Sequence, residues 1–290
     1  MLKNNKIVVY IYLVAFFIFL GTVDAKAAYN VTGFNKTVSE GVKAQKTTID
    51  VSAYGILSTD VSSMYYDLYY SNPYMFIGKF KSYSYNRETK IVAKMYFTYD
   101  YPSNQINSYY NKFDAEVNKI ISGIKSNMTQ AQKALYVHDY FIANYSYDYN
   151  AYKKLIAGDN GAVPIEHYTA VGLMVNKTGV CQGYALAYKY IMNKLGIECH
   201  MVTSSSMCHA WNIVKIDGSY YHVDVSWDDP TYDTVGGGAH KYFLLSDAAI
   251  GNTAYGRTKH YGYTMKGKAT STKYDNYFWN NVTSTVTYYN

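Results

Sequence analysis

Residues 209–225 read HAWNIVKIDGSYYHVDV, two β-prone runs separated by Asp217-Gly218. An Asp-Gly pair between such runs is a strong signal for a two-residue hairpin turn. Counting outward from that turn places Trp211 opposite Asp224. His209 and Asp224 then become diagonal neighbours on one sheet face, with backbones about 7–8 Å apart. The stretch therefore predicts a carboxylate that holds an imidazole, provided that no three-residue loop slips the register.

A helix is predicted just upstream, from about Cys181 to Leu195, with Gly196 as a left-handed stop. Cys181 thus lies at or next to a helix N-terminus. The partial positive charge and unpaired N–H groups there stabilise a thiolate and can hold an oxyanion. A cysteine in this place is predisposed to act as a nucleophile. Two further strands, Ile197–Thr203 and Tyr242–Leu245, are expected beside the hairpin.

The earlier part of the chain mixes helices and strands. Apolar residues recur at helical spacing from Phe113 to Ile124. Residues 129–132 (TQAQ) form a capping box that begins the next helix. Further upstream, Lys90–Phe97 reads as a strand among short alternating runs. With no internal repeat and no long linker, residues 28–105 are interpreted as an N-terminal α+β leader region.

The N-terminus has the pattern of a secretory signal peptide. Two lysines precede an apolar run from Ile7 to Leu20, and an A-x-A pattern follows at residues 25–27. The run is shorter than the roughly 20 residues needed to span a bilayer, although an uncleaved anchor is the alternative. We therefore predict a signal peptide at residues 1–27. The mature protein is expected to be secreted or envelope-associated, with no stable membrane insertion after cleavage.

The amino-acid composition indicates which kinds of partner the protein could bind. The net charge is +6 with no run of Lys or Arg, which argues against a nucleic-acid partner. The 37 tyrosines suggest a half-exposed aromatic surface for sugars or peptides, or else ordinary strand packing. The three cysteines leave at least one without an intramolecular disulfide. Cys199 and Cys208 could pair, but the sequence alone does not establish it.

Other titratable residues are interpreted as structural. His138 and Asp139 are predicted to be packing and surface positions, and His200 and His222 to be structural or exposed. A zinc site is the alternative, drawn from five residues of suitable type: Cys181, Cys199, His200, Cys208 and His209. These residues show no C-x-x-C or H-x-x-x-H spacing, and the three cysteines fall on three elements. We therefore predict no metal and no cofactor.

Three blocks together resemble the transglutaminase-like family, in the family's order. They are GVCQGYA at 179–185, CHAWN at 208–212 and YHVDVSWDDP at 221–230. The resemblance extends over roughly residues 110–265. It implies an α+β fold with a papain-like or transglutaminase-like core, in which the nucleophile-bearing helix packs on an antiparallel sheet. Residues 106–265 would form this catalytic domain, and residues 266–290 a C-terminal extension packed on it.

The resemblance also implies a chemistry. Cys181 would be the nucleophile, His209 the general base and acid, and Asp224 the group that orients His209. Tyr168 is our suggestion for the second oxyanion donor, from its place in the segment before Cys181. Family members form a thioacyl intermediate from an amide, which an amine resolves in cross-linking enzymes and water resolves in proteases or deamidases. Gln182 stands where animal transglutaminases carry a tryptophan, which argues against glutamine–lysine cross-linking but not against thiol chemistry.

The expected substrate is a protein or a cell-wall peptide. A secreted cysteine protease or amidase is the nearest alternative. A non-catalytic envelope-binding protein on the same fold is the alternative from another class. The oligomeric state stays open.

Overall fold

The computed structural model describes residues 6–10, 29–229 and 240–276. The chain divides into two compact units, Met1–Tyr110 and Asn111–Asn290. Most of the predicted signal peptide and the glycines at 236–238 lie outside the described residues. None of the described helices is both long and apolar enough to cross a bilayer.

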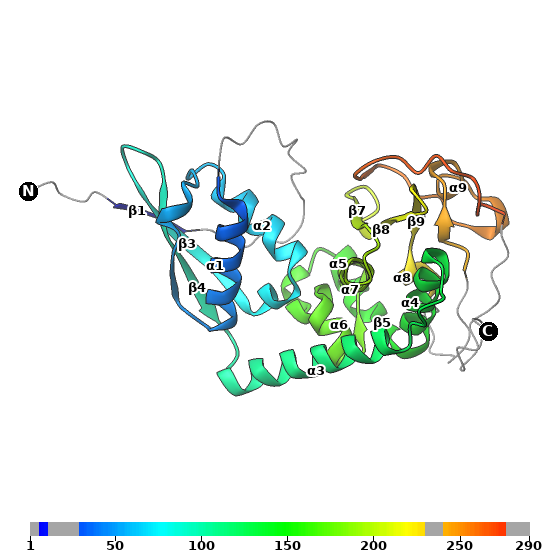
Figure 1. The fold of residues 1–290 in the computed structure, drawn as a ribbon, viewed down its shortest axis with the longest axis horizontal. Coiled ribbons are helices and arrows are strands. Elements are labelled where there is room, and N and C mark those ends of the chain that lie inside the picture. The colour runs from blue at the N-terminus through cyan, green and yellow to red at the C-terminus, as the bar shows by residue number, and fades with distance from the viewer. Residues whose placement is uncertain (1–5, 11–28, 230–239, 277–290) are drawn as a thin grey trace, which may run out of the picture. The chain divides into compact units, whose positions relative to one another are not determined.

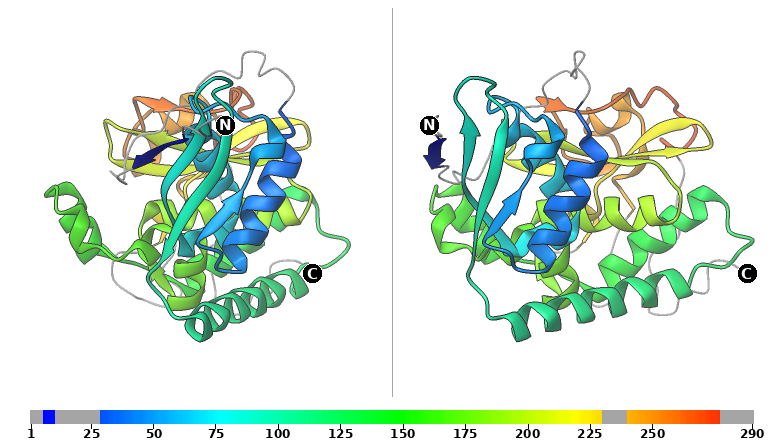
Figure 2. Two further views of the ribbon diagram at one scale, coloured as in Figure 1. Left: turned by 90° about the vertical axis from the view of Figure 1, so that its left-hand side faces the viewer. Right: turned by 60° about the vertical axis from the view of Figure 1, so that its left-hand side comes forward.

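The first unit is built on a four-stranded antiparallel sheet with the order β1-β3-β4-β2 (Figures 1 and 2). Its strands are β1 (Lys6–Tyr10), β2 (Thr48–Asp50), β3 (Gly78–Asn86) and β4 (Val92–Tyr99). Its helices are α1 (Val31–Lys43) and α2 (Val61–Ser71), with short 3-10 turns η1 (Ser52–Tyr54) and η2 (Pro73–Ile77). The strand predicted at Lys90–Phe97 is confirmed as β4.

Helix α1 packs through one apolar face, which buries Phe34, Val38 and Val42 completely. Gly41 of this helix lies against the Ile49 side chain of β2. Apolar residues at helical spacing meet apolar residues of the sheet, as expected for a helix that covers a sheet face.

The second unit supplies most of the helices. They are α4 (Gln130–Asn144), α5 (Tyr149–Ile156), α6 (Ala170–Asn176), α7 (Cys181–Lys194), α8 (Val225–Asp228) and α9 (Asp247–Ile250). The 3-10 turns are η3 (Asn160–Ala162), η4 (Ile165–Tyr168) and η5 (Ala254–Gly256). The long helix α3 (Ser103–Ser122) contains the boundary between the two units. It begins before the predicted stripe and ends before Ile124, whereas the capping box at the start of α4 is confirmed.

The second unit also holds a five-stranded antiparallel sheet, in the order β10-β9-β8-β7-β11. The strands are β7 (Cys199–Ser204), β8 (His209–Ile216), β9 (Ser219–Val223), β10 (Phe243–Leu245) and β11 (Tyr263–Thr264). A short parallel pair, β5 (Ser146–Tyr147) and β6 (Thr178–Gly179), completes the unit. Helix α7 contacts β7 and β8, so the predicted packing of this helix on an antiparallel sheet is confirmed.

The hairpin between β8 and β9 has the predicted register. Ile216 pairs with Ser219, and Asn212 with Val223. Asp217 and Gly218 have φ angles of 49° and 86°, as a turn with two left-handed residues requires. The β8–β9 ladder ends at the pair of Asn212 and Val223, so the predicted pairing of Trp211 with Asp224 is wrong. The N–H of Asp224 instead bonds the carbonyl of Tyr242, and its side chain caps α8.

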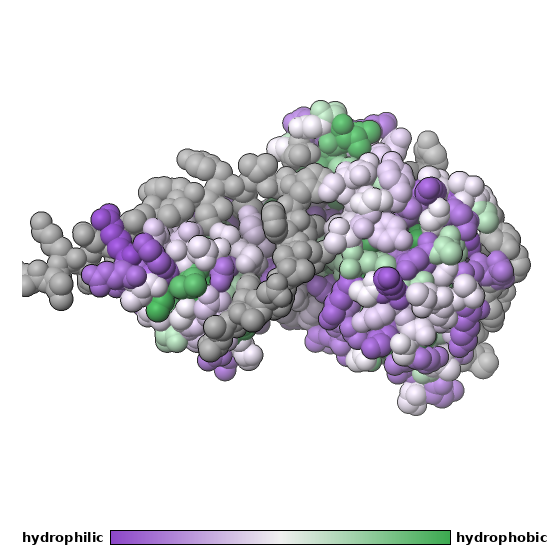
Figure 3. Space-filling model, turned by 90° about the horizontal axis from the view of Figure 1, so that it is seen from above, coloured by the Kyte–Doolittle hydropathy of each residue, from purple (hydrophilic) through white to green (hydrophobic). Residues whose placement is uncertain are grey.

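Tyrosine contributes to the core as well as to the surface. Tyr65, Tyr184 and Tyr188 are among the largest fully buried side chains, whereas Tyr149 and Tyr261 are exposed. On the face seen in Figure 3, strongly apolar patches are small and separated by neutral and hydrophilic surface. Ordinary packing therefore accounts for many of the tyrosines, and the described residues visible on this face form no broad apolar patch.

Candidate active site

Cys181 is the first residue of α7 and only 2% exposed. Several contacts fix the helix that carries it. Asn212 of β8 donates its side-chain N–H to the carbonyl of Ala185, at 2.9 Å. Tyr184 hydrogen-bonds the carboxylate of Asp229. The predicted placement of a thiol at a helix start is confirmed, and side chains of the sheet and of the chain after α8 hold that helix in position.

His209 and Asp224 meet as the hairpin predicted. The Nε2 of His209 lies 2.6 Å from Oδ2 of Asp224, and both side chains are buried. The other oxygen of Asp224, Oδ1, accepts the hydroxyl of Ser226 at 2.9 Å and the backbone N–H of Trp227 at 3.2 Å. Since Nε2 is engaged by the carboxylate, Nδ1 is the ring nitrogen left for the thiol.

The electrostatics of this pair favour an ion pair. Burial alone would lower the pKa of His209, but the charge and hydrogen bond of Asp224, helped by those of Cys181, raise it to about 10. Burial would raise the pKa of Asp224, yet the charge and hydrogen bonds of His209 and His260 hold it well below its usual range. The site therefore keeps a charged carboxylate beside a ring that readily holds a second proton.

His260 is a site residue that sequence reasoning missed. Its Nε2 lies 2.9 Å from Oδ2 of Asp224, so Asp224 receives a second imidazole donor, and its side chain is fully buried. The ring of His209 also stacks on Trp211 and Trp227, at centroid distances of 5.5 and 5.0 Å. His260 follows η5 without any motif around it, and only the folded chain brings it to the carboxylate.

Two tyrosines lie close to the thiol. Tyr168 of η4 is buried, and its hydroxyl has no hydrogen-bond partner among the described residues. Burial, followed by the charges of Cys181 and Cys208, raises its pKa to about 12, so the hydroxyl remains a donor. Tyr147 of β5 was not predicted. Burial and the charge of Cys181 raise its pKa well above the usual value, while a hydrogen bond from the backbone N–H of Cys181 lowers it.

The three cysteines are free thiols. Cys199 is fully buried in β7, and Cys208 adopts a left-handed φ of 49° immediately before His209. The open possibility of a Cys199–Cys208 disulfide is therefore not realised. The five residues weighed as a zinc set do not converge, because within the described part of the chain only two other groups of ligand atoms do. One is His209, Asp224 and His260, and the other is His138, Asp139 and His240.

The second group corrects a prediction. His138 and Asp139 of α4 were expected at packing and surface positions, but both side chains are buried, at 0% and 1% exposure. His138 lies between Asp139 and Asp228. Burial alone would lower its pKa, but these two carboxylates raise it to about 9. His222 is likewise buried, between Trp211 and Asp247, whereas His200 is half-buried beside Glu198.

A cysteine at the tip of a helix, packed on a sheet that carries the histidine, defines a papain-like α+β core. Within that class the chain is similar to the transglutaminase-like superfamily over part of its length. Residues 117–225 match the family model of the transglutaminase-like superfamily, and this span contains Cys181, His209 and Asp224.

Solved structures give distant likenesses. One described as a TGase is 14% identical, covers 51% of this chain and 43% of its own, and has a TM-score of 0.35. A candidate cysteine protease from Cytophaga hutchinsonii is 16% identical, with coverages of 50% and 52% and a TM-score of 0.29. A candidate protease from Parabacteroides distasonis is 11% identical, with coverages of 48% and 32% and a TM-score of 0.25. The chain thus spans about a third to a half of their lengths. No curated protein matches it.

Proposed function

We propose that this protein is an extracytoplasmic thiol enzyme that opens an amide of a protein or cell-wall peptide through a thioacyl intermediate on Cys181. The observation that carries the proposal is the hydrogen-bonded series of Cys181, His209 and Asp224, with 2.6 Å between the last two. The signal-like N-terminus supports secretion, and the thiol at the helix start supports nucleophilic chemistry.

The proposed reaction has two half-steps. The thiol proton is already held on Nδ1 of His209, so Sγ of Cys181 attacks the amide carbonyl carbon as a thiolate, and the carbonyl oxygen becomes an oxyanion. The C–N bond then breaks, the amine leaves with the proton held by His209, and a thioester remains. Water or an amine next gives a proton to His209 and attacks the thioester, and the thiolate leaves. Asp224 stays ionised throughout and holds the ring through Nε2.

The oxyanion needs preorganised donors. The backbone N–H of Cys181 at the start of α7 and the hydroxyl of Tyr168 are the groups proposed for this role. The Tyr168 hydroxyl supports the idea because it is buried near the thiol without another partner among the described residues. The hydroxyl of Tyr147 accepts a hydrogen bond from the backbone N–H of Cys181 in this structure. An oxyanion that binds the same N–H would therefore displace the Tyr147 hydroxyl or accept the hydrogen bond together with it.

The decisive experiment is product analysis by mass spectrometry. The mature protein is incubated with a labelled primary amine and with peptidoglycan stem peptides or unfolded protein. New amine adducts indicate acyl transfer, released ammonia indicates deamidation, and shortened chains indicate proteolysis. Cys181→Ala should abolish every product together with iodoacetamide labelling at mildly acidic pH. Cys199→Ala removes a buried thiol outside the site and should retain them, whereas products that persist in Cys181→Ala would remove the nucleophile assignment.

The rival function is non-catalytic binding of envelope fragments on the same fold. It predicts that fragments bind equally well to the wild type and to Cys181→Ala, and that the wild type forms no product. A thiol that reacts with iodoacetamide only at alkaline pH, like an ordinary cysteine near pKa 8.5, would favour this rival.

A further inference from the structure

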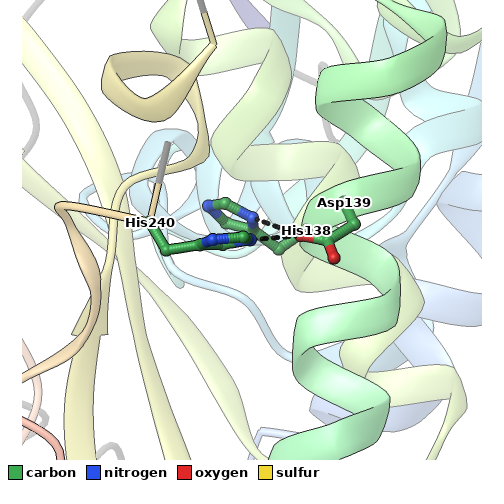
Figure 4. Close-up of side chains that lie close together, drawn as sticks. All are labelled: His138, Asp139 and His240. Carbon is green, nitrogen blue, oxygen red and sulfur yellow. Dashed lines mark hydrogen bonds and ion pairs between the residues drawn. The ribbon is translucent and has the colours of Figure 1, made fainter. Parts of the chain in front are cut away.

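A second buried cluster of ionisable side chains lies outside the Cys181 site. Figure 4 shows His138 and Asp139 of α4 converging with His240, which precedes β10. Oδ1 of Asp139 is 3.2 Å from Nδ1 of His138 and 2.7 Å from Nε2 of His240. The two histidine rings pack 5.2 Å apart. The exposed side-chain fractions are 0%, 1% and 3% for His138, Asp139 and His240, so the group is almost sealed from water.

Proton counting shows that this cluster needs an extra positive charge. His138 has a carboxylate on each ring nitrogen, because its Nε2 lies 3.1 Å from Oδ2 of Asp228. A neutral imidazole has one N–H, so it can donate to only one of the two. The other contact would set a nitrogen lone pair against a carboxylate oxygen. The clash is relieved by a second proton on His138, by a proton on one of the two carboxyl groups, or by a metal ion near Asp139.

Asp228 is arranged as an orienting group for a ligand histidine. Its Oδ1 accepts the backbone N–H groups of Lys241 and Tyr242, at 2.8 and 3.2 Å. It therefore remains a fixed acceptor for Nε2–H of His138, which leaves Nδ1 with its lone pair facing Asp139. A carboxylate that fixes the tautomer of a ligand histidine in this way is a usual companion of metal sites.

The spacing of the ligand atoms suits a small divalent ion. Nδ1 of His138, Oδ1 of Asp139 and Nε2 of His240 all lie within 4.8 Å of one another. Tetrahedral Zn²⁺ with bonds of about 2.0–2.1 Å keeps its ligand atoms about 3.3 Å apart. The separation of 3.2 Å already matches, and that of 2.7 Å widens to it by a shift of well under about 1 Å.

Two atoms of the cluster have no partner. Within residues 6–10, 29–229 and 240–276, Oδ2 of Asp139 and Nδ1 of His240 make no hydrogen bond, although both are buried. Such orphaned atoms are costly unless something else binds there. By contrast, His209, Asp224 and His260 leave no carboxylate oxygen unused. The orphaned Oδ2 of Asp139 is a further ligand atom for an ion, and it distinguishes the two groups.

We propose that His138, Asp139 and His240 bind a divalent first-row metal ion, for which Zn²⁺ is the best match by donor set and spacing. Two neutral imidazoles and the carboxylates of Asp139 and Asp228 balance its charge. The ion joins α4 to the segment before β10, and through Asp228 to α8. Since Asp224 is the N-cap residue of α8, the ion braces the element that positions the active-site carboxylate.

The test uses tag-free mature protein carrying Cys181→Ala, so that the reactive thiol cannot bind the probe metal. Zn²⁺ is titrated by calorimetry, and Co²⁺ binding is followed by visible absorption. We expect about one equivalent of ion, d–d bands with Co²⁺, and a higher melting temperature with Zn²⁺ than with EDTA. Asp139→Asn and His240→Gln should each weaken Zn²⁺ binding at least about 10-fold. His200→Gln is the matched control, since this half-buried histidine also bonds a carboxylate, and it should change nothing.

Folding of each variant is checked by circular dichroism, and the melting shift of the unaltered cluster gives a readout that needs no cluster variant. The proposal is overturned if Zn²⁺ neither binds nor raises the melting temperature, since an extra proton in the cluster then takes the place of the ion. It is equally overturned if Zn²⁺ binds as tightly to folded His240→Gln as to its parent, because the ion would then lie elsewhere.

Discussion

At the scale of single residues, the state of His209 depends on Asp224. Burial pushes the pKa of the imidazole down, and the neighbouring carboxylate more than reverses that effect. Asp224→Asn keeps the shape and removes the charge. We expect the pKa of His209 to fall from about 10 to near or below 6.5, and kcat/KM to fall by about 10²–10⁴-fold.

The measurement is the ring ¹⁵N shift of His209 against pH, assigned by its loss in His209→Gln. In the wild type the ring should stay doubly protonated through neutral pH and lose a proton only near pH 10. In Asp224→Asn it should be neutral at pH 7.5. A ring that stays protonated at that pH without the carboxylate would show that Asp224 is not the source of the shift.

His260 is predicted to be a positioning residue that acts through Asp224. Its N–H helps to keep Asp224 ionised, and a hydrogen bond to a charged group contributes about 1.5–3 kcal/mol. His260→Ala should lower kcat/KM about 10-fold and raise the pKa of Asp224, so the acid limb of the pH profile moves to higher pH. His260→Gln offers a side-chain N–H and should restore part of both effects. An acid limb that does not move in His260→Ala would leave His260 with a packing role only.

The residues that the sequence predicted are those governed by local rules. Cys181 could be placed because a helix start is a local feature, and Asp224 because a two-residue turn relates its position to that of His209. His260 and His240 could not be placed, since they reach Asp224 and Asp139 from 36 and 101 residues away along the chain. Neither lies on a strand with a predictable register, so no spacing rule connects them to their partners.

At the scale of elements, the motif around Cys181 requires close contact between α7 and η4. A Cβ on Gly183 would lie 2.8 Å from the carbonyl oxygen of His167 and 3.4 Å from that of Thr169. A backbone oxygen cannot rotate away as a side chain can. Gly183 belongs to the motif GVCQGYA, on which the family resemblance rests. The close approach of η4 explains why a residue without a side chain is needed at this position.

Gly183→Ala is therefore predicted to destabilise the protein. The alanine gains about 0.5–1 kcal/mol of helix propensity, but forcing η4 away from α7 costs about 1–3 kcal/mol. The net loss should appear as a lower urea midpoint, and activity should fall because Tyr168 lies on η4. Gly161→Ala, which has no atom within 4 Å of its added Cβ, is the matched control and should stay within about 0.5 kcal/mol. A stabilised Gly183→Ala would contradict the close contact.

Prediction at the element scale succeeded where short-range signals were strong and failed at the ends of elements. The Asp217-Gly218 turn predicted the β8–β9 register, and TQAQ predicted the start of α4. The ladder was expected to reach Asp224, but Tyr242 takes the Asp224 N–H and a short helix follows. The partner of the Asp224 N–H is thus set by the segment that leads into β10, and the residues of the Asp217-Gly218 turn carry no information about that segment.

At the scale of the whole molecule, the thiol proposed as nucleophile is enclosed in the second unit. Cys181 is 2% exposed, whereas Cys208 is half-buried. A polypeptide substrate must reach Sγ, so the site has to open before reaction, while a small reagent needs a smaller opening. The sequence predicted the thiol and its partners but not its enclosure, because burial depends on the packing of elements distant in the chain.

Reagent size should therefore control the labelling of Cys181. We compare a single-cysteine variant that retains Cys181 (Cys199→Ala, Cys208→Ala) with one that retains Cys208 (Cys181→Ala, Cys199→Ala). Iodoacetamide and a polymer-linked maleimide are applied to each, and rates are normalised to the unfolded chain. The ratio of the small-reagent rate to the large-reagent rate should be at least about 10-fold higher for Cys181 than for Cys208. A 10-fold difference corresponds to an opening of the Cys181 site that costs about 1.4 kcal/mol more for the bulky reagent than for iodoacetamide. Equal ratios would mean that Cys181 is as accessible in solution as Cys208, and that no opening step precedes the proposed chemistry.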